Sequence, residues 1–267
     1  MLPEPGVALA VTAHDPGQRL VGMIEAHLPA LVARYAVVSA YCSRDTSPTV
    51  LNLLREHSVL VRVDGNEPSG IEGIGAVRRE AVRAGLQAGT THLQLCDFDR
   101  ALHWVAHYPA ELEAVLAEIP GYDLLVLGRT ARAWATHPPY QTETEPLFNK
   151  VFAQVSGLDW DVGAGSRGLS RRGAETLLAL SRENSVGTDA EWPLLLLRQP
   201  GFRVGQRLCE GLEFETADAF GPEIEAAGGY AAWEAQMSAD PRRWVFRLRL
   251  ALFIAEAALR FYDVGRP

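Results

Sequence analysis

The sequence predicts an α/β protein, a Rossmann-like three-layer αβα sandwich with a mostly parallel central sheet. Two observations carry this prediction. Apolar runs alternate four times with helical patterns in the first hundred residues, which is typical of parallel strands joined by crossover helices. The runs are continuously apolar rather than alternating, as expected for strands covered on both faces. They occupy residues 6–12, 35–40, 59–64 and 93–96.

Helices are expected between these strands, because the connecting segments carry apolar residues at helical spacing. They are predicted over residues 19–32, 49–57 and 74–88. Proline, glycine and short polar residues break the pattern after the first three strands and predict turns or loops there. These breaks lie at residues 13–17, 43–48 and 65–70.

The second half of the chain continues the α/β pattern less regularly. A strand is predicted over residues 123–128, and alternating residues predict a half-exposed strand over 202–208. Segment 129–145 has aromatic residues and prolines but no apolar period, which favours a lid over a disordered loop. Residues 158–170 are rich in glycine and predict a loop. Further helices are expected over 109–119, 146–155, 172–182, from 188 onward, 222–237 and 241–262.

Composition narrows the classes of function. The chain has 267 residues, 48% of them hydrophobic, and a net charge of -8, which disfavours nucleic acid as the main partner. Three widely spaced cysteines form no CxxC pair, which argues against a disulfide framework or a structural zinc site and favours a reducing compartment. We identify no signal peptide and no transmembrane segment, so a cytoplasmic protein is expected.

Acidic residues follow the predicted strands of the first half. Because ligands of parallel sheets bind beyond the carboxyl ends of the strands, these residues predict a shared polar cleft. Aspartate is also a common turn former and helix cap, and for Asp45 a capping role is an equal alternative. The residues are Asp15, Asp45, Asp64, Asp97 and Asp99.

The Asp97-Phe98-Asp99 stretch suggests a metal site. Where the chain bends at a strand end, both carboxylates can turn toward one hard cation, and Mg²⁺ or Mn²⁺ accepts such ligands together with substrate phosphates. A bound cation would also let an acidic protein hold a polyanionic ligand. No GxGxxG or GxxxxGK[ST] motif is present, which lowers the odds of an NAD enzyme or a P-loop NTPase.

Together, the helix that begins Gly75-Ala76-Val77-Arg78 and the strand ending in Asp97-Phe98-Asp99 resemble the nucleotide half of the GT-A glycosyltransferases. Segments of the second half resemble the acceptor half of family-2-like transferases, including polyprenyl-phosphate sugar transferases. The resemblance covers roughly residues 6–215, and the matching segments of the second half are Asn149, 161–171, 188–192 and 201–204.

This resemblance implies a metal-dependent transfer of a sugar from a nucleotide-diphosphate donor to an acceptor hydroxyl. Asp97 and Asp99 would hold Mn²⁺ or Mg²⁺ and, through it, the diphosphate. The other donor contacts implied are Asp45 near the base, His14 or Asp15 near the base or ribose, and Arg78 near the nucleotide or sugar.

For the chemical step, the resemblance implies an inverting enzyme. Asp189 or Glu191 matches the acidic pair that supplies the general base, which takes a proton from the acceptor hydroxyl. The chain has Thr188-Asp189 where Glu-Asp is common, and it lacks the transmembrane helices of lipid-linked members. Retaining members often use a late histidine as a metal ligand, whereas the last histidine here is His137.

Two alternatives stay open. A sugar-phosphate nucleotidyltransferase would need a basic, glycine-rich loop after the first strand, which residues 14–17 do not supply. A non-catalytic binding module on the same fold would fit the weak acidic pair and the amphipathic last helix.

We expect one GT-A domain over residues 1–267, with a nucleotide-sugar half at about 1–100, an acceptor half at about 101–220 and C-terminal helices at about 221–267. The last helix, 241–262, has a basic face. It is expected to pack on the domain or on a homodimer partner, and a peripheral membrane contact is the alternative.

Overall fold

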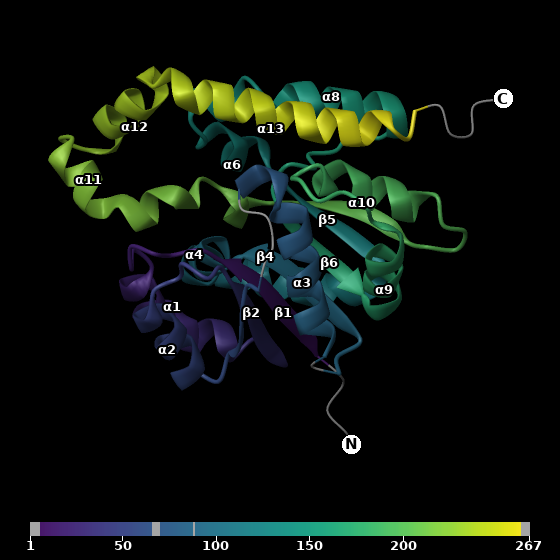
Figure 1. Ribbon diagram of the computed structural model, residues 1–267, viewed down its shortest axis with the longest axis horizontal. Coiled ribbons are helices and arrows are strands. Elements are labelled where there is room, and N and C mark those ends of the chain that lie inside the picture. The colour runs from purple at the N-terminus through teal and green to yellow at the C-terminus, as the bar shows by residue number, and fades with distance from the viewer. Residues whose placement is uncertain (1–5, 66–69, 88, 263–267) are drawn as a thin grey trace.

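The computed structural model describes residues 6–65, 70–87 and 89–262. Within these residues, seven strands form one sheet in the order β3-β2-β1-β4-β6-β5-β7 (Figure 1). Every neighbouring pair is parallel except the two pairs that β6 makes, with β4 and with β5. The mostly parallel α/β sheet is therefore confirmed. The strands are β1 Val7–Ala13, β2 Val37–Cys42, β3 Leu60–Val63, β4 His92–Asp97, β5 Leu124–Arg129, β6 Ser166–Ser170 and β7 Val204–Cys209.

Helices cover both faces of the sheet, as the continuous apolar runs predict. On β1, Leu9 and Val11 belong to the core of one face, and Ala8 and Ala10 belong to the core of the other. The first face is covered by α1 Val21–Val32, α2 Pro48–Glu56, α4 Phe98–His107 and α5 Pro109–Glu118. The second face is covered by α3 Ile74–Leu86, α9 Arg171–Leu180 and α10 Thr188–Leu197.

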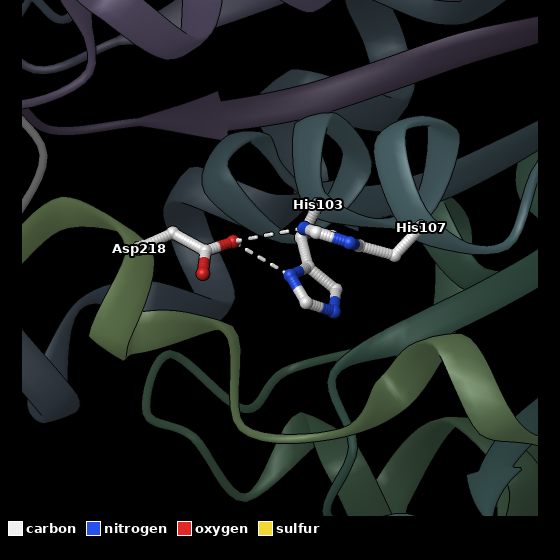
Figure 2. Close-up of side chains that lie close together, drawn as sticks. All are labelled: His103, His107 and Asp218. Carbon is white, nitrogen blue, oxygen red and sulfur yellow. Dashed lines mark hydrogen bonds and ion pairs between the residues drawn. The ribbon is translucent and has the colours of Figure 1, made fainter. Parts of the chain in front are cut away.

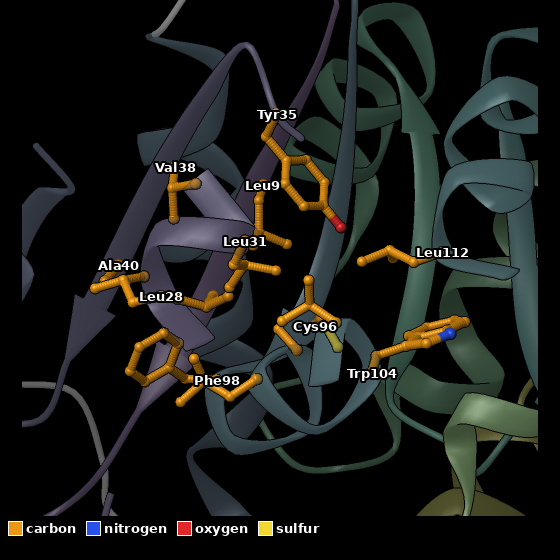
Figure 3. Close-up of a cluster of buried hydrophobic side chains, with 14 of the residues drawn as sticks. Leu9, Leu28, Leu31, Tyr35, Val38, Ala40, Cys96, Phe98, Trp104 and Leu112 are labelled. Carbon is orange, nitrogen blue, oxygen red and sulfur yellow. The ribbon is translucent and has the colours of Figure 1, made fainter. Parts of the chain in front are cut away.

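Phe98, the residue between the two aspartates, lies in the first core. Its side chain is 1% exposed and sits in the same cluster as Leu28 of α1 and Ala40 of β2 (Figure 3). Burying a phenylalanine contributes roughly 1.5–3 kcal/mol. The ring therefore anchors the chain where β4 passes into α4.

Two long helices form an outer layer over α10. α8 Glu145–Ser156 and α13 Pro241–Leu259 lie side by side at the top of Figure 1. A third core joins them to α10 through residues such as Phe148, Ala190 and Ile254. The single helix predicted over 222–237 is wrong: the chain forms α11 Gly221–Ala226 and α12 Tyr230–Ala239. Gly228 and Gly229 separate them, with φ of +88° and +117°.

Other predicted elements also need correction. The predicted loop over 158–170 contains β6, whose sequence Ser-Arg-Gly-Leu-Ser has no apolar run. The helix α4 starts directly after Asp97 and was not predicted. The segment predicted as an irregular lid, 129–145, contains two short helices, α6 Ala131–Ala135 and α7 Pro139–Thr142. Most of the loop predicted at 65–70 lies outside the described residues.

No described helix is long and apolar enough to cross a membrane. The described residues also form four short 3₁₀ segments: η1 Gly70–Glu72, η2 Ile119–Gly121, η3 Glu210–Leu212 and η4 Glu215–Phe220.

Candidate active site

A cavity of about 840 Å³ lies beyond the carboxyl ends of the parallel strands, where ligands of such sheets bind. One wall is built by strand ends of the first half and by α3, and the other by segments of the second half and α13. The first wall includes His14, Tyr41, Asp45, Asp64, Arg78 and Asp97. The second includes Arg129, His137, Gln141, Asp189, Glu215 and Arg247.

Asp97 lies at the centre of this arrangement. Its Oδ1 accepts a hydrogen bond of 2.7 Å from Thr12 Oγ1 on the neighbouring strand β1. Gly165, with φ of +72°, passes close to it: a Cβ there would lie 3.4 Å from Asp97 Oδ2 and 3.2 Å from Arg78 Nη2. The glycine thus keeps a carboxylate and a guanidinium accessible on the same side of the cavity.

Asp99 faces a different environment. It lies in the first turn of α4, where Oδ1 accepts a hydrogen bond from the backbone N–H of Arg100, and it does not line the cavity. Burial, followed by the charges of Glu215 and Asp97, raises the pKa of Asp99 to about 7. The raised pKa thus reflects burial first and the neighbouring carboxylates second.

Glu215, which sequence reasoning missed, brings a third carboxylate to this region. Its Oε1 accepts a bond of 2.7 Å from Arg100, while its buried Oε2 has no partner in the described chain. Three carboxylates (Asp97, Asp99, Glu215) therefore surround one arginine, and this charge balance fits a divalent cation. Among the described residues, the three do not gather their oxygens within 4.8 Å of one another, so a shared ion would require side-chain movement.

The expected donor contacts of the first half divide into two groups. His14 and Asp45 line the cavity with exposed side chains, and His14 Nδ1 lies 2.7 Å from Ser43 Oγ. Asp15 does not line it. Its two carboxylate oxygens accept bonds of 2.9 Å from the backbone N–H groups of Arg19 and Leu20. These contacts fix the turn before α1, which is the structural role that aspartate has at such positions.

The two residues of the expected acidic pair, Asp189 and Glu191, also lie in different environments. Asp189 lines the cavity, and its Oδ1 accepts bonds of 2.8 Å from Arg78 Nη1 and 2.9 Å from Arg167 Nη2. Glu191 does not line it: Ser181 Oγ and the backbone N–H of Arg182 donate to its carboxylate at 2.5 and 3.0 Å. Glu191 thus holds the segment between α9 and α10, and Asp189 is the member of the pair that faces the cavity.

The segment predicted as a lid supplies two further polar groups. His137 and Gln141, each 5% exposed, line the cavity. His137 Nδ1 donates to the carbonyl of Ala133 at 3.0 Å, and Nε2 is buried without a partner among the described residues, as is Gln141 Oε1. Burial, and then the charges of Arg129 and Arg100, lower the pKa of His137 to about 3, so the ring is neutral at pH 7.

Arg129, at the end of β5, fixes this wall. It donates to Asp161 at 2.8 Å and to Glu145 at 2.7 Å, and Glu145 also accepts from Arg247 of α13 at 3.2 Å. The sequence gives little signal for these residues, since each is an ordinary charged residue until the fold brings it to the cavity. Besides the predicted Asp189, the aromatic and proline content of 129–145 is the signal that points to this wall.

No protein-family model matches the sequence, and no curated protein is significantly similar to it. Solved structures do match. One is glucosyl-3-phosphoglycerate synthase from Mycobacterium tuberculosis, in complex with Mn²⁺, UDP and phosphoglyceric acid, with a TM-score of 0.50 and 14% identity over 76% of this chain and 68% of that chain. A crystal structure of a mycobacterial protein has a TM-score of 0.50 and 13% identity, over 85% of this chain and 76% of that chain. The expected fold is thereby confirmed: the chain has the fold of the GT-A glycosyltransferases.

Proposed function

We propose that the protein is a metal-dependent glycosyltransferase that moves a sugar from a nucleotide-diphosphate donor to a hydroxyl acceptor. The observation that carries the proposal is the position of Asp97. It ends β4 in the middle of the sheet, with its carboxylate at the cavity between the two halves of the fold. The fold and a carboxylate-rich strand end together support this reaction class.

On the donor side, we assign the base and ribose to the exposed strand-end residues His14 and Asp45, and the diphosphate or sugar to Arg78. Asp97 and Asp99, joined by Glu215, would hold Mn²⁺ or Mg²⁺, since hard oxygen ligands suit these ions. When bound, the ion would neutralise charge on the diphosphate leaving group. The similar mycobacterial enzyme was solved with Mn²⁺ and UDP.

On the acceptor side, Asp189 is our candidate for the general base of an inverting reaction. The two arginines fix its Oδ1, and Oδ2 accepts no hydrogen bond in the described part of the chain. This oxygen can receive a proton from an acceptor hydroxyl that lies in the cavity. The unpartnered His137 Nε2 can accept a hydrogen bond from a second hydroxyl, which would orient the acceptor.

We further propose that the acceptor carries an anionic group. A smaller cavity of about 250 Å³ adjoins the first and shares Gln141 and Arg247 with it. Its charged lining comprises Arg242, Arg243 and Arg247 against the single carboxylate of Asp240. Arg247 also donates to Glu145, so three guanidinium groups meet two carboxylates, and this excess favours a carboxylate or phosphate ligand. The phosphoglyceric acid bound to the similar mycobacterial enzyme has the same chemistry.

The test is turnover with a panel of nucleotide sugars, Mn²⁺ and acidic or neutral hydroxyl acceptors. Asp189→Asn should abolish transfer in samples that circular dichroism shows to be folded, and NMR of the product anomer made by the wild-type protein should show inversion. Retention of configuration would refute the role of Asp189 as base. Preference for a nucleoside triphosphate and a sugar phosphate would favour a nucleotidyltransferase. Binding without turnover of any donor would favour a non-catalytic module.

We also propose that α13 joins two copies of the chain. Its outward face carries apolar residues at heptad spacing, and four of them are at least half exposed. Antiparallel pairing about Leu252 would place Val245 opposite Leu259 of a second copy and bring Arg249 within one position of Glu256. This self-complementarity suits a two-fold interface better than a membrane. The exposed residues are Val245, Leu248, Leu252 and Leu259, at 54%, 50%, 58% and 56%.

The three cysteines support our proposal of a reducing, cytoplasmic environment. Cys42, Cys96 and Cys209 are all buried and free. Burial, the largest effect, raises the pKa of Cys42 and of Cys209 to about 12, so both stay as unreactive thiols.

A further inference from the structure

Two histidines and an aspartate converge outside the cavity, on the far end of α4. His103 and His107 lie one turn apart on this helix, with ring centroids 4.5 Å apart, and Asp218 approaches them from η4 (Figure 2). His103 Nδ1 lies 2.6 Å from Asp218 Oδ2, and His107 Nε2 lies 4.0 Å from the same oxygen. One ligand atom from each of the three residues lies within 4.8 Å of the other two.

The second ring nitrogen of His103 is also fixed by a carboxylate. Nε2 lies 3.2 Å from Glu213 Oε1, and Glu213 Oε2 in turn accepts a bond of 2.6 Å from Arg132. Histidines that bind metals usually donate their other N–H to a carboxylate, which sets the tautomer and the ring orientation. His103 is 4% exposed, so this geometry is built into the core side of α4.

We propose that His103, His107 and Asp218 form a binding site for Zn²⁺ or a similar divalent transition metal. His103 Nδ1, His107 Nε2 and an Asp218 oxygen would be its ligands, and water would take the fourth position. Histidines spaced i and i+4 on a helix present both rings to one ion. A tetrahedral zinc site needs donor atoms about 3.3 Å apart, so the exposed Asp218 side chain has only to move back slightly from His103.

The chemistry of this donor set separates it from the site at Asp97. Imidazole nitrogen suits zinc, copper or nickel, whereas an all-carboxylate site suits magnesium or manganese. Cysteine spacing, which disfavours a structural zinc site built from cysteines, does not bear on this one, because no cysteine takes part. The two proposed sites therefore differ in metal, and each can be removed without touching the other.

Without a metal, the same residues form a charged hydrogen-bond cluster. Burial opposes a charge on His103, but the hydrogen bond and charge of Asp218, together with Glu213 and Glu215, outweigh it and raise the pKa of the ring. The protein thus folds with this cluster satisfied. A bound ion would add a clamp between α4 and η4, the segment that carries Glu215 and Thr216 to the cavity.

The experiment uses the full chain, stripped with a chelator and titrated with Co²⁺, then with Zn²⁺ in competition. We expect one Co²⁺ per chain with the visible absorption of tetrahedral nitrogen and oxygen coordination, displaced by Zn²⁺. His107→Ala and Asp218→Asn should each weaken binding by about 10–100-fold or more. His107 and Asp218 are exposed, so circular dichroism should show unchanged folds for both variants.

Two controls make the result decisive. His57→Ala, at a histidine outside the cluster, should leave Co²⁺ binding unchanged, and Asp97→Asn should also leave it unchanged because that residue belongs to the other proposed site. Equal binding in the wild-type protein and His107→Ala, or loss of the absorption band only in Asp97→Asn, would overturn the proposal. So would the absence of stoichiometric binding to the wild-type chain.

Discussion

Arg78 of α3 donates a hydrogen bond of 2.8 Å to Asp189 of α10, across 111 positions of sequence. Both side chains are almost fully buried, and the same carboxylate oxygen accepts a bond from Arg167 of β6. Asp189 of α10 thus links α3, the helix before the Asp97 strand, to β6 in the second half of the chain. The cavity lies between the elements that this carboxylate joins.

The stability of this arrangement should depend more on Asp189 than on Arg78. Asp189→Asn leaves two buried guanidinium groups without a charged partner, and we expect a loss of about 3–5 kcal/mol in the free energy of unfolding. Arg78→Met leaves Asp189 paired with Arg167 and should cost less. Urea unfolding measures both. Arg83→Met on the same helix, where the arginine is half-exposed, should cost under about 1 kcal/mol. A larger loss for Arg78→Met than for Asp189→Asn would contradict the bridging role.

The close approach of Gly165 to Asp97 and Arg78 gives a second prediction. Gly165→Ala should weaken nucleotide-diphosphate binding, because the new Cβ crowds both groups at 3.4 and 3.2 Å. Gly201 is the matched control: its φ is +75°, close to the +72° of Gly165, but nothing lies within 4 Å of an added Cβ. Both variants should lose about 1–2 kcal/mol of stability from the backbone conformation. Calorimetry should show weaker binding for Gly165→Ala alone, and equal affinities would argue against the crowding.

His137 should make the protein less stable in mild acid. Its pKa is lowered to about 3 in the folded chain, whereas an unfolded histidine titrates near 6.5. As pH falls below about 6.5, the unfolded chain therefore binds a proton that the folded chain does not, and stability falls by up to about 1.4 kcal/mol per pH unit until about pH 3.

The test compares unfolding free energies between pH 6.5 and pH 4. His137→Gln should lose less stability over this range than the wild-type protein, while His27→Gln, at a histidine on α1, should follow the wild-type curve. Parallel curves for the wild type and His137→Gln would show that the buried ring does not carry the effect.

Strands whose burial follows from local sequence pattern can be predicted, whereas a strand that depends on contacts between distant residues cannot. β1, β2 and β4 are apolar runs whose burial is set by local pattern, and they were predicted to within a residue or two. β6 could not be recognised that way, because its Arg167 is buried only through pairing with Asp189, and Gly168 is required by contact with Ile119. The position of β6 in the sheet therefore depends on contacts between residues that are far apart in the sequence.

Tertiary contacts also decide which candidate site residues line the cavity and which have a structural role. A strand-end aspartate can bind a ligand or cap the next helix, and sequence spacing does not distinguish the two. Asp15 fixes the turn before α1, and Asp45 lines the cavity. Glu191 and Asp189 lie two positions apart but face different partners, because successive residues of a helix turn by about 100°. Glu215 and His137 reach the cavity only through the tertiary fold.

If α13 forms the proposed dimer contact, one substitution on its outward face should halve the mass of the particle in solution. Leu252→Glu should convert the protein to a monomer in sedimentation or light scattering, because the charge would lie at the centre of the antiparallel contact. Leu180→Glu, on the exposed end of α9, is the control and should leave the dimer intact. A wild-type protein that is monomeric and binds anionic vesicles through α13 would instead support membrane contact.

In the proposed function, Asp97 mediates metal-dependent binding of the donor diphosphate. The ligand is the nucleoside diphosphate that gives the wild-type protein its largest thermal shift. Calorimetry should measure its Mn²⁺-dependent affinity for the wild-type protein and for two variants. Asp97→Asn retains an oxygen for the bond from Thr12, so the fold should persist. Asp159→Asn removes the same charge at an exposed position and serves as control. We predict a loss of at least about 100-fold in affinity for Asp97→Asn alone, about 2.7 kcal/mol. Unchanged affinity in that variant would rule out this role of Asp97.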